Sequence, residues 1–275
     1  MIGARSETIL GQYPKSWQLS AHGAPLWRDE TLLAPVSTAF GPAMLKRASE
    51  GKSFTTSSSL LRWYEGSGSA NILKKQKNVQ LLEWIDGPAL TNLIDDEEDD
   101  EAIDALSDVI TKLQAPKQTP LKARLVSLGS LMHPLLAQKY SENLVHRHGA
   151  RLIRHMLQTT KNPLPLHGNL HFDKVMHHSK RGWLTIAPKG VCGDLHYEFA
   201  SALCHSGEQR DFRDIRHHLS ARATRIAKHQ SLNKDRLLTF AFCHACLKAL
   251  EAERDSENAT HWSDMSVLLL DSLVD

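Results

Sequence analysis

Short apolar runs bounded by turn residues dominate the first third of the chain and predict β-strands. Residues 41–47, GPAMLKR, form one such run. Residues 70–78 and 79–87 predict two further strands, joined by a polar Lys-Lys-Gln-Lys-Asn turn. Between these runs, SSSLLRWYEG at 57–66 has the apolar spacing of a short amphipathic helix that stops at Gly66. The pattern therefore predicts a small sheet accompanied by one helix.

The apolar period becomes helical from residue 95 onward. Seven consecutive acids at 95–101 precede apolar positions at helical spacing, and Pro116 ends the pattern. The helix dipole favours negative charge in a first turn by about 0.3–1 kcal/mol at best. We therefore interpret the acidic run as a solvated helix start rather than as a cation or partner site. The change from sheet to helix falls near residues 86–89. Further helical patterns cover 121–138, 141–158, 214–229 and 236–255.

The segment 163–190, PLPLHGNLHFDKVMHHSKRGWLTIAPKG, interrupts the helical part. Val175-Met176 and residues 183–186 are short β-type runs around a Ser-Lys-Arg-Gly turn, which predicts a hairpin. A loop, a tight hairpin and a second loop bring positions 169, 174 and 187 close together. Phosphotransfer sites use such an arrangement to place one Asp at the acceptor hydroxyl and an Asn and a second Asp at the metal.

The residues of this segment resemble a known family. HGNLHFDKVM, GWLTIAPKG and GDLHYEFA are similar to HGDLHxxN, WxxIDPKG and GDPxYExA of the aminoglycoside and hydroxyurea phosphotransferases of the streptomycin-kinase type. Residues 42–46, 60–73 and 81–87 resemble, in order, the strand with the ATP-contacting lysine, the following helix-to-strand region and the inter-lobe hinge. The agreement is colinear over about residues 40–205.

The resemblance implies an α+β, protein-kinase-like fold with two lobes. A small N-terminal β-sheet lobe, residues 1–87, is expected on the nucleotide side, and a larger helical lobe, residues 88–275, is expected to carry the catalytic-loop hairpin. The implied nucleotide is ATP. Its contacts are expected at Lys46, at Glu83 and Ile85 of the hinge, and at Lys174.

Three positions depart from the family pattern where the chemistry is expected. Asn169 stands in place of the catalytic Asp, Lys174 in place of the metal-binding Asn, and Ala187 in place of the metal-binding Asp. A neutral amide cannot accept the acceptor's proton. Magnesium requires oxygen ligands, and neither an ammonium nor a methyl group supplies one. Magnesium binding is therefore doubtful on the residues present, and no metal ligand is assigned.

Other residues of the site leave alternatives open. SFTTSSS precedes Leu60, so the helix acid that pairs with the ATP-contacting lysine is missing. Asp173 remains beside the metal position, and Asp194, which matches the family's GDP acid, is interpreted as structural support. Lys174 has two interpretations: a salt bridge with Asp173 or another acid, or direct pairing with phosphate, which would permit nucleotide binding without magnesium.

Three functional hypotheses follow. The first is a pseudokinase that binds a nucleotide, a small ligand or an unidentified protein partner. The second is an enzyme that still phosphorylates a small hydroxylated molecule by altered chemistry. The third is a decayed relative of a resistance enzyme with no biochemical role. Losing one preorganised active-site charge commonly costs about 100- to 1000-fold in rate, and three groups are lost here. We therefore favour the pseudokinase.

Composition and charge exclude several other classes. Lys+Arg 33 against Asp+Glu 31 gives a net charge of +2, which argues against a dedicated nucleic-acid binder. No apolar run approaches the roughly 20 residues of a membrane span, and no secretory signal is predicted.

Four cysteines fit a reducing cytoplasm rather than a disulfide scaffold. Cys243 and Cys246 form a C-x-x-C within an apolar helical run, which we interpret as a buried helix face. The sixteen histidines lack companion ligands at metal spacing.

Overall fold

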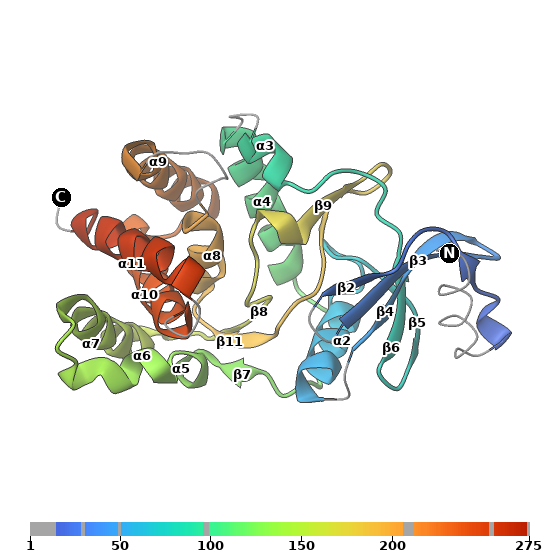
Figure 1. Cartoon of the computed structure of the whole chain (residues 1–275), viewed down its shortest axis with the longest axis horizontal. Coiled ribbons are helices and arrows are strands. Elements are labelled where there is room, and N and C mark those ends of the chain that lie inside the picture. The colour runs from blue at the N-terminus through green and yellow to red at the C-terminus, as the bar shows by residue number, and fades with distance from the viewer. Residues whose placement is uncertain are drawn as a thin grey trace.

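The computed structural model divides the chain into a sheet-rich N-terminal part and a helical C-terminal part (Figure 1). Figure 1 shows the strands of the first part gathered at one end of the molecule and the long helices at the other. The residues that the structure describes are 15–28, 31–48, 51–95, 99–205, 212–252 and 256–273.

A six-stranded antiparallel sheet forms the N-terminal part. Its order is β1-β3-β4-β6-β5, and β2 also pairs with β3. The side chains of β3 alternate between buried and half-buried positions, so one face packs on a small core that includes Trp17 and Leu45. The strand predicted at 41–47 and the hairpin predicted over 70–87 are both present. The bounds are η1 Lys15–Trp17, β1 Ser20–Ala21, β2 Leu26–Arg28, β3 Thr31–Thr38, β4 Gly41–Arg47, β5 Ile72–Gln76 and β6 Val79–Glu83.

Helix α2, Lys52–Tyr64, starts five residues before the predicted helix. Serine and threonine are weak helix formers, but contacts of Ser58 within the helix and with β6 stabilise the helical conformation here. Ser58 Oγ donates to Phe54 O at 2.7 Å and accepts from Nε2 of Gln80, on β6, at 2.5 Å. The helix ends as predicted, because Glu65 adopts φ 52 and Gly66 follows at φ 77.

The connection between the two parts pairs with a later strand. Gly87 N–H donates to His177 O at 2.9 Å, His177 N–H donates to Pro88 O at 2.9 Å, and Leu90 N–H donates to Val175 O at 2.7 Å. A Cβ at Gly87 would lie 2.5 Å from His177 O, so only glycine allows this approach. The lobe boundary predicted between residues 87 and 88 falls inside this pairing and stays a prediction.

Helices make up most of the C-terminal part. Helix α10 is buried along most of its length and packs on α11, α7 and α8. Cys243 and Cys246 are fully buried free thiols on α10, as the sequence predicted. Among the described residues, no helix has the length and apolarity needed to cross a membrane. The bounds are α3 Thr91–Asp95, α4 Asp99–Gln114, α5 Leu128–Leu131, α6 His133–Leu136, η2 Ala137–Tyr140, α7 Leu144–Thr159, α8 Ala200–Leu203, α9 Phe212–Gln230, α10 Lys234–Ala252 and α11 Ser256–Asp271.

Two helical predictions need correction. Residues 121–127 are not helical: Val126 and Ser127 form β7, which pairs in parallel with β11, and the helix starts only at Leu128. Ser127 caps that start by accepting the N–H of Ser130 at 3.0 Å. Helix α11 was not predicted at all, because its apolar residues cluster at its C-terminal end and give little periodic signal.

The acidic run contacts α9 rather than only solvent. Asp99, with a side chain 13% exposed, pairs with Arg222 at 3.0 Å. Asp100 and Asp104 pair with Arg225 at 2.7 Å and 2.6 Å. Residues 96–98 lie outside the described residues. The run does start a helix, and Asp100 is 73% exposed and Glu101 is exposed as well, but Asp99 is largely buried against α9, so the solvated interpretation needs correction at Asp99.

Candidate functional site

The predicted loop, hairpin and second loop are present. Strand β8, Leu164–Leu166, leads into the first loop and the turn η3, Phe172–Lys174. The hairpin follows as β9, Val175–His178, and β10, Gly182–Thr185, and the second loop ends at β11, Val191–Gly193. Ile186 N–H and Thr185 Oγ1 both donate to Lys174 O at 2.9 Å. These bonds hold Lys174 next to the loop that carries Ala187.

His167 joins the two loops from the inside. Its carbonyl accepts the N–H groups of Lys189 at 2.9 Å and Gly190 at 3.0 Å. Its ring Nε2 lies 2.9 Å from Ile186 O, an atom that only accepts, so Nε2 carries the proton. Nδ1 then accepts Asn169 N–H at 3.3 Å. Burial lowers the pKa of His167 to about 3, so the ring is a neutral structural element at neutral pH.

Glu198 fixes the backbone of the first loop and was missed as a site residue. Its carboxyl, fully buried, accepts His167 N–H at 2.9 Å and Gly168 N–H at 3.3 Å. Burial raises its pKa to about 8, although these two hydrogen bonds act in the opposite direction. Gly168 adopts φ +74, and a Cβ there would lie 2.5 Å from Val191 Cγ2. The available sequence signal was an acid within the apolar stretch YEFA.

Asp194 has the structural role that the sequence suggested. Its Oδ2 accepts from Arg236 Nη2 at 2.6 Å and from Thr160 Oγ1 at 3.1 Å, and its Oδ1 lies 2.6 Å from His196 Nδ1. Burial opposes ionisation, but the hydrogen bonds from His196 and Arg236 hold the pKa of Asp194 well below its usual range. The carboxylate thus ties β11 to α7 and α10.

Ala187 keeps a backbone conformation that suits a different side chain. Its φ is 54, in the left-handed region that alanine rarely adopts and that Asp and Asn tolerate better. At the position where the resemblance predicts a metal-binding Asp, the backbone conformation is thus one that Asp tolerates, and the side chain offers no oxygen atom.

The charge of Lys174 acts on lysines from both parts of the chain. Burial lowers the pKa of Lys46, on β4, and the charge of Lys174 lowers it further. The charge of Lys174 also contributes to the lowered pKa of Lys189 and of His171. Burial is the first cause for both residues, and the pKa of His171 falls to about 4. Among the described residues, no carboxylate forms an ion pair with Lys46. Helix α2 carries no acid, and Glu50 lies outside the described residues.

The hinge residues Glu83 and Ile85 differ in what they can offer. The Glu83 carboxylate accepts Asn71 N–H at 2.9 Å and binds the Arg181 guanidinium, so its side chain is already engaged. The Glu83 N–H is engaged as well, because it donates to Asn71 O at 2.9 Å. A nucleotide contact at Glu83 stays a prediction. The Ile85 N–H and C=O have no hydrogen-bond partner within the described part of the chain, which leaves them available to a ligand.

The donors at the expected metal positions do not fit magnesium. Asn169 offers one amide oxygen, Lys174 repels a cation, and Ala187 has no donor. Within the described ranges, no three His, Cys, Asp or Glu side chains gather as a metal-binding group. Asp173, the acid left in the loop, is 49% exposed and lies 3.3 Å from His171 Nδ1.

Comparisons with known proteins agree with this geometry. The model of a family described as aminoglycoside/hydroxyurea antibiotic resistance kinase matches residues 16–256. Streptomycin 3''-kinase of Klebsiella pneumoniae is 28% identical over 240 residues, which cover 85% of this chain and 88% of that enzyme. Streptomycin 6-kinase of Streptomyces griseus is 24% identical over 198 residues, which cover 68% of this chain and 63% of that enzyme.

Solved structures share the fold at low identity. Aminoglycoside phosphotransferase APH(4)-Ia, in a ternary complex with ADP and hygromycin B, has a TM-score of 0.67 at 10% identity, covering 96% of this chain and 97% of that chain. A choline/ethanolamine kinase family protein from Mesorhizobium loti has a TM-score of 0.68 at 10% identity, covering 100% and 95%. The predicted α+β, two-lobed, protein-kinase-like fold is thereby confirmed.

Proposed function

The chain belongs to the aminoglycoside/hydroxyurea antibiotic resistance kinase family, and on this premise we propose that it is a pseudokinase that binds a nucleotide without magnesium. ATP-dependent phosphoryl transfer to a small-molecule hydroxyl is lost or nearly lost. One observation carries the proposal: the hydrogen-bonded frame of the two loops is intact, while Asn169, Lys174 and Ala187 replace the three groups that handle the proton and the metal.

The chemistry of the three side chains explains the expected loss of activity. Phosphoryl transfer depends on positioning and on neutralising charge at the phosphates, and the family arrangement does both with carboxylates and a metal. Asn169 cannot take the acceptor's proton or hold a hydroxyl by charge. The metal-free site must then rely on fixed cations alone.

Fixed cations also support retained nucleotide binding. The charge of Lys174 contributes to the lowered pKa of both Lys46 and Lys189, and the described residues place no carboxylate in an ion pair with any of the three. An ammonium is a competent point charge for phosphate. Lys174 at the metal position would thus replace part of the metal's charge. The family neighbour bound to ADP supports the nucleotide as the ligand, and the free backbone groups of Ile85 support the hinge as its base-binding edge.

Other aspects of the proposal rest on single observations. We place the protein in the cytoplasm because its four cysteines are all free thiols. The two lobes are taken as residues 1–87 and 88–275, with the nucleotide between them. The partner is a nucleotide or another small molecule. An unidentified protein remains the alternative if no nucleotide binds.

The direct test is ATP binding measured by calorimetry and thermal unfolding, once with EDTA and once with magnesium. We expect ATP to bind in EDTA, with a stabilisation of about 2.7 kcal/mol at a hundredfold excess over the Kd. Lys46→Ala and Lys174→Ala should each weaken this binding at least tenfold. Lys180→Ala, at an exposed lysine of the hairpin turn, is the matched control and should leave the affinity unchanged.

Binding that requires magnesium, or no response to ATP at all, would contradict the proposal. The competing possibility is an active kinase of altered chemistry, which the exposed carboxylate of Asp173 next to Lys174 favours. ATP turnover with streptomycin or hydroxyurea as acceptor distinguishes the two. A rate above that of Lys46→Ala, removed by Asp173→Asn, would establish the enzyme instead.

A further inference from the structure

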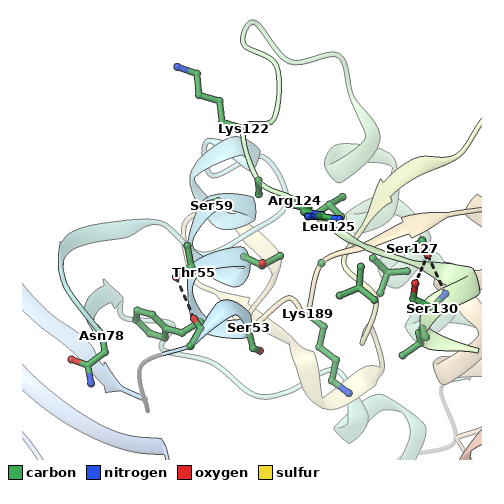
Figure 2. Close-up of a pocket in the computed structure, with 18 of the residues that line it drawn as sticks. Ser53, Thr55, Ser59, Asn78, Lys122, Arg124, Leu125, Ser127, Ser130 and Lys189 are labelled. Atoms are coloured by element: carbon green, nitrogen blue, oxygen red, sulfur yellow. Dashed lines mark hydrogen bonds between the residues drawn. The ribbon is translucent and has the colours of Figure 1, made fainter. Parts of the chain in front are cut away.

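A large groove lies beside the nucleotide cleft, between α2 and the segment 122–131 (Figure 2). Its volume is about 1570 Å³. The walls come from the first half of α2, from the β5–β6 hairpin, from residues 122–131 and from residues 189–191. Lys189 is the residue that this groove shares with the lysine cluster of the cleft. Lys46, Lys174, Asn169 and the hinge do not line it.

The charge of the groove is entirely positive. Five cationic side chains line it and no acid does, and among the described residues none of the five forms an ion pair with a carboxylate. They come from three of the four walls, the β5–β6 hairpin, the segment 122–131 and residues 189–191: Lys75, Lys77, Lys122, Arg124 and Lys189. Unpaired cations that share one concave surface raise the local potential and concentrate anions there. This distribution contrasts with the chain as a whole, whose net charge is only +2.

Neutral donors accompany the cations. Helix α2 begins at the groove with Gly51 as its N-cap, without a side-chain cap and without an acid in its first turn. Its first N–H groups therefore lack the carboxylate that usually satisfies them. Ser53, Thr56 and Ser59 add hydroxyl groups from the same helix, and Figure 2 labels Ser53 and Ser59 on α2. Ammonium, guanidinium, hydroxyl and helix N–H groups are together the usual ligands of phosphate.

We propose that this groove is a second binding site, separate from the nucleotide cleft, for a small molecule with one or more phosphate groups, such as a sugar phosphate or a polyphosphate. Its volume exceeds the roughly 300–1,000 Å³ of ordinary small-molecule pockets, so a ligand larger than a single phosphate fits. An aminoglycoside carries several ammonium or guanidinium groups, and the five cations repel it. The ligand of this groove thus differs in charge from an aminoglycoside.

The test uses inorganic tripolyphosphate as the probe, titrated calorimetrically into the whole protein at low salt in EDTA. We expect Lys122→Glu/Arg124→Glu to weaken binding at least tenfold, and Lys77→Glu, on the opposite wall, to weaken it about threefold. The matched control is Arg151→Glu/Arg154→Glu, the same charge change at two exposed residues of α7, which should leave the affinity within twofold. Lys46→Ala should retain tripolyphosphate binding even though it weakens ATP binding.

The outcomes separate this site from the cleft. Loss of tripolyphosphate binding in Lys46→Ala, with full binding in the groove variants, would assign the anion to the cleft and overturn the proposal. Equal weakening by the α7 control would mean unspecific charge attraction and would overturn it as well. Tighter binding of a single-stranded oligonucleotide than of glucose 6-phosphate and tripolyphosphate would replace the small molecule with nucleic acid. Failure of ATP to bind the cleft would contradict the proposed function alone and leave the groove result standing.

Discussion

Ala187 shows at the scale of one residue how the site has changed. Its left-handed backbone, φ 54, is held by the loop that His167 organises and costs an alanine about 1–2 kcal/mol. The surrounding hydrogen bonds thus impose a conformation that the residue itself disfavours. The constraint belongs to the hydrogen-bonded loop and not to the side chain of residue 187.

Substitution of Ala187 should therefore stabilise the protein. Ala187→Gly removes the strain and is expected to raise the free energy of unfolding by about 1 kcal/mol, measurable as a shift of about 2–4 °C in thermal unfolding. Ala187→Asp should gain at least as much, because the carboxylate lies near Lys46 and Lys174, and it should make the unfolding temperature respond to magnesium. A loss of stability in both variants would show that the loop does not hold residue 187 in this conformation.

Glu198 should give the protein a distinctive pH dependence. Its pKa is about 8 when folded and 4.5 in its ordinary state, so the folded protein holds a proton that the unfolded chain releases. The stability from this group is complete below pH 4.5 and is lost as the pH rises through about 8. The buried His167 and His171 act in the opposite direction, but below pH 6.5, because their folded pKa values are about 3 and 4. His167 and His171 therefore do not contribute between pH 6.5 and 8, where the loss of stability from Glu198 is expected.

Urea unfolding of the wild type and Glu198→Gln across that window tests this expectation. The wild type should lose stability with rising pH, by at most about 1.4 kcal/mol per unit, and Glu198→Gln should not. At pH 6.5 the variant is expected to be less stable by about 1–3 kcal/mol, because its amide group can satisfy only one of the two loop N–H donors. Parallel pH profiles for the two proteins would show that Glu198 is ionised in the folded state.

At the scale of elements, the contact between α4 and α9 is made by two arginines of different burial. Arg222, 4% exposed, forms hydrogen bonds to both oxygens of Asp99 and lies 5.6 Å from the ring of Phe172 in the turn that precedes β9. Arg225, 37% exposed, pairs with Asp104 near the surface. Only the first pair connects the helices to the candidate site.

The burial of each arginine should decide how much it contributes to the free energy of unfolding. Arg222→Ala leaves Asp99 largely buried with part of its charge uncompensated, and should cost about 3–5 kcal/mol in urea unfolding. Arg225→Ala removes a solvent-screened pair and should cost less than about 1 kcal/mol. High salt should reduce the effect of Arg225→Ala and leave that of Arg222→Ala nearly unchanged. Equal costs for the two variants would contradict this assignment.

The elements also show where sequence patterns were sufficient. Strands with clear boundaries, such as 41–47, were predicted correctly because their turn residues and apolar positions agree. Residues 121–127 have a helical apolar pattern, but Val126 N–H binds Gly190 O at 3.2 Å, and this pairing outweighs local preference. Helix α2 starts at Lys52, and its serine-rich middle, which the sequence placed in the helix, is stabilised from β6 by the hydrogen bond of Gln80 to Ser58. The strand at 126–127 was missed because its partner is distant in sequence.

At the scale of the whole molecule, Arg181 connects the two parts of the chain. From the turn between β9 and β10, its guanidinium binds the Glu83 carboxylate at the hinge and the carbonyls of Gly66 and Ser69 after α2. Asp86 adds a parallel contact by accepting Ser179 N–H at 2.9 Å. The hairpin that follows the candidate catalytic loop is thereby fixed to the N-terminal sheet.

Loss of this guanidinium should loosen the connection. Arg181→Ala is expected to cost about 1.5–3 kcal/mol, since charged hydrogen bonds contribute that much, and Asn71 N–H, which donates to Glu83, should exchange its hydrogen faster. Arg181→Lys should restore little, because an ammonium lacks the planar fork that reaches several acceptors. Lys180→Ala serves as the neighbouring control. Unchanged exchange at Asn71 in Arg181→Ala would show that the contact does not hold the two parts together.

The sequence by itself determined the family and the two-part α+β fold, because these depend on residue types in colinear order. That Asn169, Lys174 and Ala187 are changed catalytic and metal positions stays a prediction. It also identified Lys174 as a residue with two possible roles. Tertiary structure decided the rest: that Lys174 has Lys46 and Lys189 as electrostatic neighbours, that Glu198 is the anchor of the loop, and that five cations from three segments line one groove. The physical reason is distance. Burial and electrostatic interaction depend on how close groups lie in space. In this fold, residues about a hundred positions apart in sequence come together, as Glu83 and Arg181 do.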